Sequence, residues 1–142
     1  MHKIFGNKLQ GEYYTRAGAY LIPISNGKIA VVKTPKGYFF IGGGYENDET
    51  DTECITRECL EETGYSADIG EFICSAETYT FHNKVGLFHP VQYYYTGTLT
   101  EKISEQKEKD HQLEWITLQQ LKGKMFSEMQ NWALEYAFNK LK

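Results

Sequence analysis

Three glutamates, Glu58, Glu61 and Glu62, stand at spacings i, i+3 and i+4 in a stretch whose apolar residues recur with helical spacing. Residues at these spacings project from one face of a helix, so the three carboxylates converge. Like charges placed in this way destabilise a helix by ~0.2–0.5 kcal/mol per pair. No lysine between positions 50 and 70 offsets them. Because hard divalent cations prefer oxygen ligands, the cluster predicts a Mg²⁺ site, with Mn²⁺ as the other candidate ion.

The charge of the chain is concentrated around these glutamates. The net charge is −4, and residues 46–62 hold eight acidic residues against one basic residue, Arg57. An acidic patch on a mildly basic remainder argues against a surface for long nucleic acids. It favours divalent cations instead, together with a small anionic substrate.

A run of three glycines, Gly42–Gly43–Gly44, precedes the acidic helix and follows a short apolar segment. Glycines permit tight turning and close approach of the backbone to a ligand. The run is not a P-loop, because no Gly-Lys-Ser/Thr follows it, and it does not fit G-x-G-x-x-G. From the residues alone, the segment is a magnesium-binding strand–loop–helix that acts on phosphates.

Residues 43–65 resemble the Nudix box, G-x5-E-x7-R-E-U-x-E-E-x-G-U, in which U is a bulky aliphatic residue. Every invariant position matches, from Gly43 and Glu49 through the helix to Gly64. Cys59 and Tyr65 occupy two of the U positions, which affects packing and leaves the carboxylates in place. The chain is therefore similar to the Nudix hydrolases of the MutT type.

This resemblance implies hydrolysis of a nucleoside diphosphate linked to another group, by water attack on phosphorus. It implies that Glu58, Glu61 and Glu62 bind the metal, with a backbone contribution from Gly43. Arg57 is expected to pair with Glu49 or to act directly in catalysis. The proton acceptor is either Glu61 or a distal acid before Trp115. Four acids are eligible for this distal position, and Glu108 is preferred among them: Glu105, Glu108, Asp110 and Glu114.

The remaining pattern predicts a single domain, 1–142, of the α/β class. The resemblance implies an α/β/α sandwich with a mixed sheet between helices, and the non-alternating order of elements also predicts a mixed sheet. Asn26–Gly27 is a strong hairpin signal between two apolar segments. The expected strands are 17–24, 28–33, 38–41, 67–81, 90–99 and 113–116, and the expected helices are 51–63, a turn at 118–121, and 125–141, with a loop at 101–110.

Cysteine usage and hydropathy predict a cytoplasmic protein. Cys54, Cys59 and Cys74 show no disulfide or zinc spacing, and the first two fall on the apolar side of the expected helix. The opening residues lack the apolar core of a signal peptide, and no segment approaches a membrane span.

Several readings stay open at this stage. The substrate is a nucleoside triphosphate, a nucleotide sugar, ADP-ribose or a dinucleoside polyphosphate, and Tyr38, Tyr79 or Phe81 could hold its base. Tyr93–Tyr94–Tyr95 favours a strand with one face in the core. The alternative function is a nucleotide-sensing Nudix module without catalysis. A homodimer through the terminal helix also stays open, although its apolar side chains favour core packing.

Overall fold

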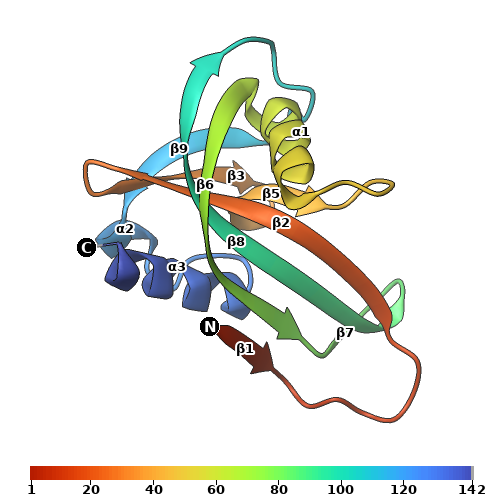
Figure 1. Ribbon diagram of the computed structural model, residues 1–142. Helices are drawn as coiled ribbons and strands as arrows, with labels where there is room; N and C mark the ends of the chain where they lie inside the picture. The colour runs from red at the N-terminus through yellow and green to blue at the C-terminus, as the bar shows by residue number, and fades with distance from the viewer. Residues whose placement is uncertain (142) are drawn as a thin grey trace.

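A computed structural model describes residues 1–141. Figure 1 shows a twisted sheet with helices on both of its faces. The helices are α1 (Asp51–Thr63), α2 (Leu118–Leu121) and α3 (Glu128–Lys140). The strands are β1 (His2–Phe5), β2 (Tyr14–Ser25), β3 (Lys28–Thr34), β4 (Gly37–Phe39), β5 (Ile41–Gly44), β6 (Tyr65–Thr78), β7 (Thr80–His82), β8 (Gly86–Lys102) and β9 (Gln112–Thr117).

Strand β2 connects the two halves of the sheet. It pairs in parallel with β8, whose other edge carries β6 and then β1, and antiparallel with β3, which leads to β4 and β9. The short strand β5 also pairs antiparallel with β2, and this pairing places the glycine run beside residues 18–21. The sheet is therefore mixed, as the order of elements predicts.

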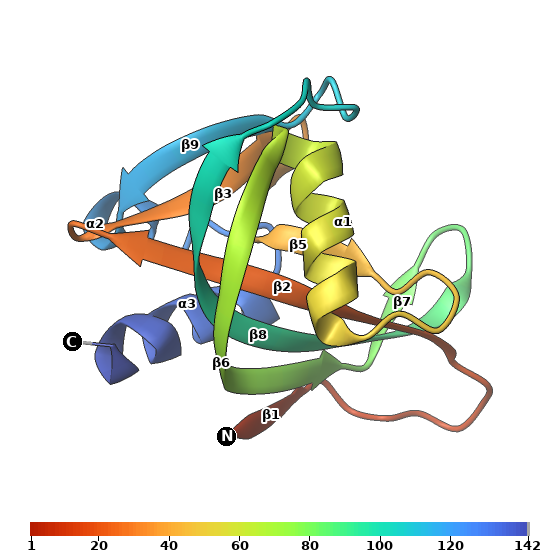
Figure 2. The same cartoon turned by 45° about the horizontal axis from the view of Figure 1, so that its top comes forward.

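Alternation along β2 separates the two layers of the core. Tyr20 and Ile22 belong to a cluster with Met129 and Leu134 of α3. Ala19 and Leu21, one position out of phase, pack with Cys54 and Ile55 of α1. Successive side chains of a strand point to opposite faces, so one strand supports both helices. Figure 2 shows α1 and α3 on opposite sides of the sheet, which confirms the α/β/α sandwich.

Helix α1 is held by defined caps at both ends. Thr50 and Glu53 form a capping box, in which each side chain accepts a hydrogen bond from the backbone N–H of the other. At the other end Gly64 adopts a left-handed conformation, with φ 79°, and its N–H donates to Leu60 O. The bounds of α1 agree with the predicted 51–63, and its buried face includes Cys54 and Cys59.

The strand predictions need several corrections. The expected strand 38–41 is divided at Phe40 into β4 and β5, and β5 includes the glycine run that was expected to be a loop. Strand β1 was not expected, because its exposed sequence lacks the alternation of a half-buried strand; pairing with β6 creates it. The expected strand 67–81 is interrupted at Tyr79 and forms β6 and β7. The expected strand 90–99 is longer, because β8 pairs with β7 at one end and reaches Lys102 at the other.

The terminal helix also begins later than predicted. Ser127 is its N-cap, so α3 starts at Glu128, whereas the apolar pattern suggested residue 125. Met125 forms a bridge with Tyr38, and its N–H donates to Asn131 Oδ1 at 2.9 Å. Its apolar side chain therefore belongs to the core without being helical. Among the helices of residues 1–141, none has both the length and the apolar character that a membrane span requires.

Candidate metal centre and active site

Arg57 joins helix α1 to the end of β5 and to the loop that follows it. Its Nε and Nη2 donate to the two carboxylate oxygens of Glu49 at 2.7 and 2.9 Å, and Nη2 also donates to Gly44 O at 2.9 Å. Nη1 donates to Glu58 at 2.5 Å and to Glu61 at 3.3 Å. The guanidinium lowers the pKa of Glu49 to about 2. All three guanidinium nitrogens are engaged by the protein, so Arg57 positions other groups.

Glu58 lies directly against the glycine run. A Cβ at position 43 would approach Glu58 Oε2 to 2.3 Å, so only glycine leaves room for this carboxylate. Burial raises the pKa of Glu58 to about 7, and the nearby charge of Glu62 adds to the rise, while Arg57 opposes it. In the absence of a cation, the charged form of this carboxylate is therefore costly.

Glu62 is almost completely buried, with 6% of its surface exposed. Its Oε1 accepts the backbone N–H of Gly42 at 2.9 Å, and its Oε2 lies 3.4 Å from His111 Nε2. Burial raises the pKa of Glu62. Glu62 in turn raises the pKa of His111 to about 9, with a contribution from Asp110. The Glu62 carboxylate is thus held at Gly42, next to Gly43, which Glu58 contacts.

The loop between β8 and β9 docks onto the C-terminal end of α1. The backbone carbonyl of Glu61 accepts the N–H groups of Lys107 and Glu108 at 2.8 and 3.0 Å. The carboxylate of Glu61 is partly exposed and points toward Arg57. This docking carries the loop acids from a distant part of the chain to the face of α1 that carries the three glutamates.

The four eligible distal acids occupy different places. Ligand atoms of Glu108, Asp110 and His111 all lie within 4.8 Å of one another, beside Glu62. Glu105 is exposed on the same loop. Glu114 lies on β9, where Tyr38 donates a hydrogen bond to it at 3.4 Å. Glu108 and Asp110 are the acids that the structure brings to the glutamates of α1.

The donor set fits a divalent cation. Glu58 and Glu62 place two carboxylates on adjacent glycines of β5, and burial penalises the charge of both. A hard cation requires oxygen donors of this kind and would relieve the repulsion between them. The Gly43 carbonyl accepts a hydrogen bond from the Cys54 thiol at 3.2 Å.

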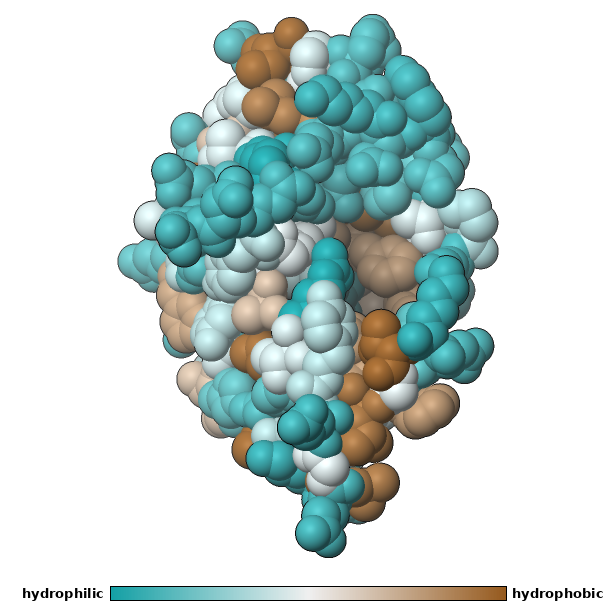
Figure 3. Space-filling model, turned by 90° about the vertical axis from the view of Figure 1, so that its right-hand side faces the viewer, coloured by the Kyte–Doolittle hydropathy of each residue, from teal (hydrophilic) through white to brown (hydrophobic). Residues whose placement is uncertain are grey.

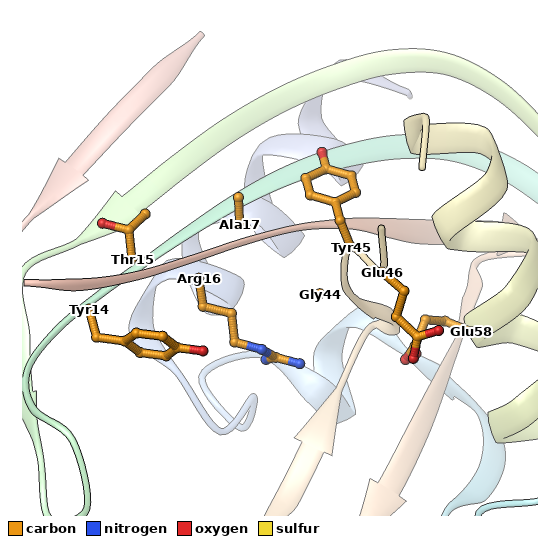
Figure 4. Close-up of a pocket in the computed structure, with 8 residues that line it drawn as sticks. All are labelled: Tyr14, Thr15, Arg16, Ala17, Gly44, Tyr45, Glu46 and Glu58. Carbon is orange, nitrogen blue, oxygen red and sulfur yellow. The ribbon is translucent and has the colours of Figure 1, made fainter. Parts of the chain in front are cut away.

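A cavity of about 400 Å³ opens beside Glu58. Figure 3 shows this face of the molecule hollowed, with hydrophilic side chains above the hollow and hydrophobic ones in and below it. Figure 4 shows Arg16 directed toward Glu46 and Glu58, with Tyr14 next to it on the same strand. The lining residues come from β2, the glycine loop and α1: Tyr14, Thr15, Arg16, Ala17, Gly44, Tyr45, Glu46 and Glu58.

The family model of the NUDIX domain matches residues 15–136 of this chain. The chain belongs to the NUDIX family. This confirms the resemblance carried by residues 43–65, and it makes the protein a hydrolase. NUDIX hydrolases act on nucleoside diphosphate derivatives and generally use divalent metals. No curated protein matches the chain by sequence.

Solved structures of NUDIX proteins share the fold at low identity. A MutT NUDIX hydrolase from Burkholderia pseudomallei is 21% identical with a TM-score of 0.71, over 87% of this chain and 98% of that chain. The E. coli ORF135 protein is 23% identical with a TM-score of 0.63, over 89% and 91%. A UDP-X diphosphatase is 18% identical with a TM-score of 0.70, over 94% and 67%.

Sequence reasoning missed three residues of this NUDIX site. Tyr14 and Arg16 precede the expected first strand, and no motif marks them. No motif singles out His111, which the structure places against Glu62. Tyr14, Arg16 and Tyr20 occupy alternate positions of β2, so the sequence could have placed them on one face of a strand. Which face lines the cavity follows only from the pairing with the neighbouring strands.

Proposed function

We propose that this NUDIX hydrolase cleaves the diphosphate linkage of a nucleoside diphosphate derivative by water attack on phosphorus, with Mg²⁺ or Mn²⁺ as cofactor. The convergence of Glu58 and Glu62 on two adjacent glycines carries the proposal. Glu58, Glu61, Glu62 and the backbone at Gly43 would hold the ion. When bound, such an ion supplies charge neutralisation of the diphosphate and a water of lowered pKa.

The protein groups around this centre have separate tasks. Glu61, partly exposed on α1, accepts the proton of the attacking water, and Glu108 is the alternative acceptor. The water oxygen bonds to phosphorus, the bond from phosphorus to the bridging oxygen breaks, and two phosphate-bearing fragments leave. Arg57, itself oriented by Glu49, is a positioning residue that holds Glu58 and Glu61.

The candidate substrates are a nucleoside triphosphate, a nucleotide sugar, ADP-ribose and a dinucleoside polyphosphate. The names of similar structures, a MutT protein and a UDP-X diphosphatase, fall within this range. The three free, buried cysteines within residues 1–141 support a cytoplasmic location, where thiols stay reduced.

The decisive experiment measures release of nucleoside monophosphate, phosphate and pyrophosphate from these four substrate classes with and without Mg²⁺. The wild-type protein is compared with Glu61→Gln and with Glu71→Gln, a matched control on the exposed part of β6. We expect metal-dependent turnover that Glu61→Gln reduces by about 10²-fold or more, as loss of a general base does. The control keeps wild-type turnover.

The alternative is a nucleotide sensor that binds without cleaving. In that case every substrate stays intact, while calorimetry with the same compounds shows Mg²⁺-dependent binding. The complete set of box carboxylates and their placement on the loop favour the hydrolase. Turnover that persists in Glu61→Gln would move the proton-accepting role to the loop acids.

A further inference from the structure

The N-terminal half of β2 extends the active site away from the metal-binding carboxylates. Tyr14 and Arg16 are two positions apart and therefore project from the same face of the strand, about 7 Å from each other. Figure 4 shows both on one side of β2, with Thr15 and Ala17 on the other. The Arg16 side chain extends away from Tyr14, toward Glu46 and Glu58 (Figure 4). The strand thus arranges a carboxylate, a guanidinium and an aromatic ring in a row.

Arg16 is a cation without a protein partner. Within residues 1–141 its side chain has neither an ion pair nor a hydrogen bond, although acidic residues line the same cavity. Gly44 makes room for it, because a Cβ at that position would lie 3.0 Å from Arg16 Nε. A guanidinium has a planar set of donors that matches two oxygens of a phosphate. Its unused donors therefore fit a phosphate in the cavity.

The exposed Tyr14 forms an aromatic pair with Phe88, which is half-buried. The two residues are partners in the parallel pairing of β2 with β8, and their rings are nearly parallel, at 16°, with centroids 6.0 Å apart. Tyr14 keeps 54% of its surface exposed, so the pair does not belong to the core. Cross-strand aromatic pairs stabilise sheets, but Tyr14 of this pair also lines the cavity that contains the Arg16 guanidinium. An exposed flat ring in that position suits a planar ligand.

We propose that Arg16 binds a phosphate of the substrate and that the Tyr14–Phe88 pair stacks its nucleobase. This inference rests on the proposed function and deepens it, because it assigns the specificity-determining end of the site. The order across the cavity, from Glu58 of α1 to Arg16 and then Tyr14 of β2, matches the order of groups in the substrate: the diphosphate at Glu58, phosphate oxygens at Arg16 and the base at Tyr14. The volume of about 400 Å³ lies within the range of small-molecule sites. Stacking accepts every base, so the subsite selects nucleotides as a class.

Calorimetric binding of non-hydrolysable probes tests this without turnover. The probes are the α,β-methylene diphosphates of adenosine, guanosine, cytidine and uridine, and methylene diphosphonate without a nucleoside, all with MgCl₂. Arg16→Gln is compared with Lys28→Gln, which removes an exposed lysine at the start of β3, opposite the last residue of β2. Tyr14→Leu is compared with Tyr14→Phe and with Phe72→Leu, an exposed aromatic whose strand register places it on the opposite face of the sheet.

The two halves of the subsite have different signatures. Arg16→Gln weakens all probes by ~10-fold or more, including the one without a nucleoside, since it removes a charge-assisted contact. Tyr14→Leu weakens only the nucleoside probes, by ~5-fold or more, while Tyr14→Phe keeps the stacking ring and binds normally. Phe88→Leu should have the same effect as Tyr14→Leu. Agreement between the two variants shows that the loss of binding does not come from a local folding defect in one of them. Lys28→Gln and Phe72→Leu bind like the wild type.

The outcomes separate this inference from the proposed function. If the wild type turns over a substrate while Arg16→Gln and Tyr14→Leu bind all probes like their controls, the subsite is overturned and the hydrolase stands. If these variants lose binding but no substrate is cleaved, the subsite stands and the hydrolase fails. A wild-type protein that binds none of the probes overturns the subsite whatever the turnover.

Discussion

The Cα of Gly43 lies so close to the Glu58 carboxylate that a Cβ there would approach Oε2 to 2.3 Å. Gly43→Ala therefore displaces the carboxylate, whereas the backbone at position 43 needs no unusual conformation. We expect the affinity for Mn²⁺ to fall about tenfold or more, measured by calorimetry, because metal sites require exact ligand placement. The effect acts through Glu58, so adding Gly43→Ala to Glu58→Ala should cause little further loss. An additive double variant would contradict this account.

Removing the charge of Glu58 is expected to stabilise the metal-free protein. Burial and the proximity of Glu62 raise the pKa of Glu58 to about 7, so at pH 8 the carboxyl is ionised in an environment that destabilises its charge. Glu58→Gln should increase the free energy of unfolding by ~1 kcal/mol at that pH without metal. In addition, Mg²⁺ should raise the melting temperature of the wild type and leave that of the variant unchanged. A destabilised metal-free variant would show that its contact with Arg57 outweighs the burial penalty.

Glu49 is expected to support activity from a distance. Its two oxygens hold Arg57, which in turn holds Glu58, so Glu49→Gln loosens a proposed metal ligand without removing one. Substitution of partners of this kind typically reduces metal affinity or activity by about 10–100-fold. Steady-state assays over a Mg²⁺ titration should show the loss mainly as a higher metal requirement. Glu53→Gln, which changes only the capping box, is the matched control, and an equal effect there would refute a specific role for Glu49.

The pH dependence of stability contains a contribution from Glu77. His2 Nε2 lies 2.5 Å from Glu77 Oε2, and His89 Nε2 lies 2.8 Å from Glu77 Oε1, so hydrogen bonds from the histidines lower the pKa of this carboxyl. The other polar groups near it are Tyr79 and Ser75. A carboxyl with a lowered pKa stabilises the fold above its unfolded pKa, and this stability is lost as the pH falls through its folded pKa.

Glu77→Gln should therefore lower the free energy of unfolding by ~1 kcal/mol at pH 6. The difference from the wild type should shrink as the pH falls below about 4, where the unfolded carboxyl is already protonated. Urea unfolding at a series of pH values measures both curves. A difference that stays constant down to pH 2 would mean that packing, and not the charge of Glu77, carries the effect.

The local sequence pattern predicted the glutamates of the candidate site. The residues at the edge of its cavity depend on the pairing of strands that are far apart in the sequence. The spacing of Glu58, Glu61 and Glu62 reveals their common face because a helix repeats within four residues. By contrast, Tyr14 meets Phe88 only because β2 and β8 pair in parallel, and no local period records that pairing. Strand β1 was missed for the same reason, since its partner β6 lies far along the chain.

The choice among the four distal acids can be decided by substitution. The N–H of Glu108 donates to the Glu61 carbonyl at 3.0 Å, and its side chain lies in the cluster beside Glu62. Glu105 and Glu114 lie outside that cluster within the described residues. We expect Glu108→Gln to reduce kcat by ~10–100-fold, a loss at or below that caused by removal of a general acid or base. The kcat values of Glu105→Gln and Glu114→Gln should stay within about twofold of the wild-type value. Asp110→Asn tests the neighbouring acid, which contacts His111 at 2.9 Å and should act only through that histidine. If Asp110→Asn has the larger effect and His111→Gln reproduces it, the distal function belongs to the Asp110–His111 pair.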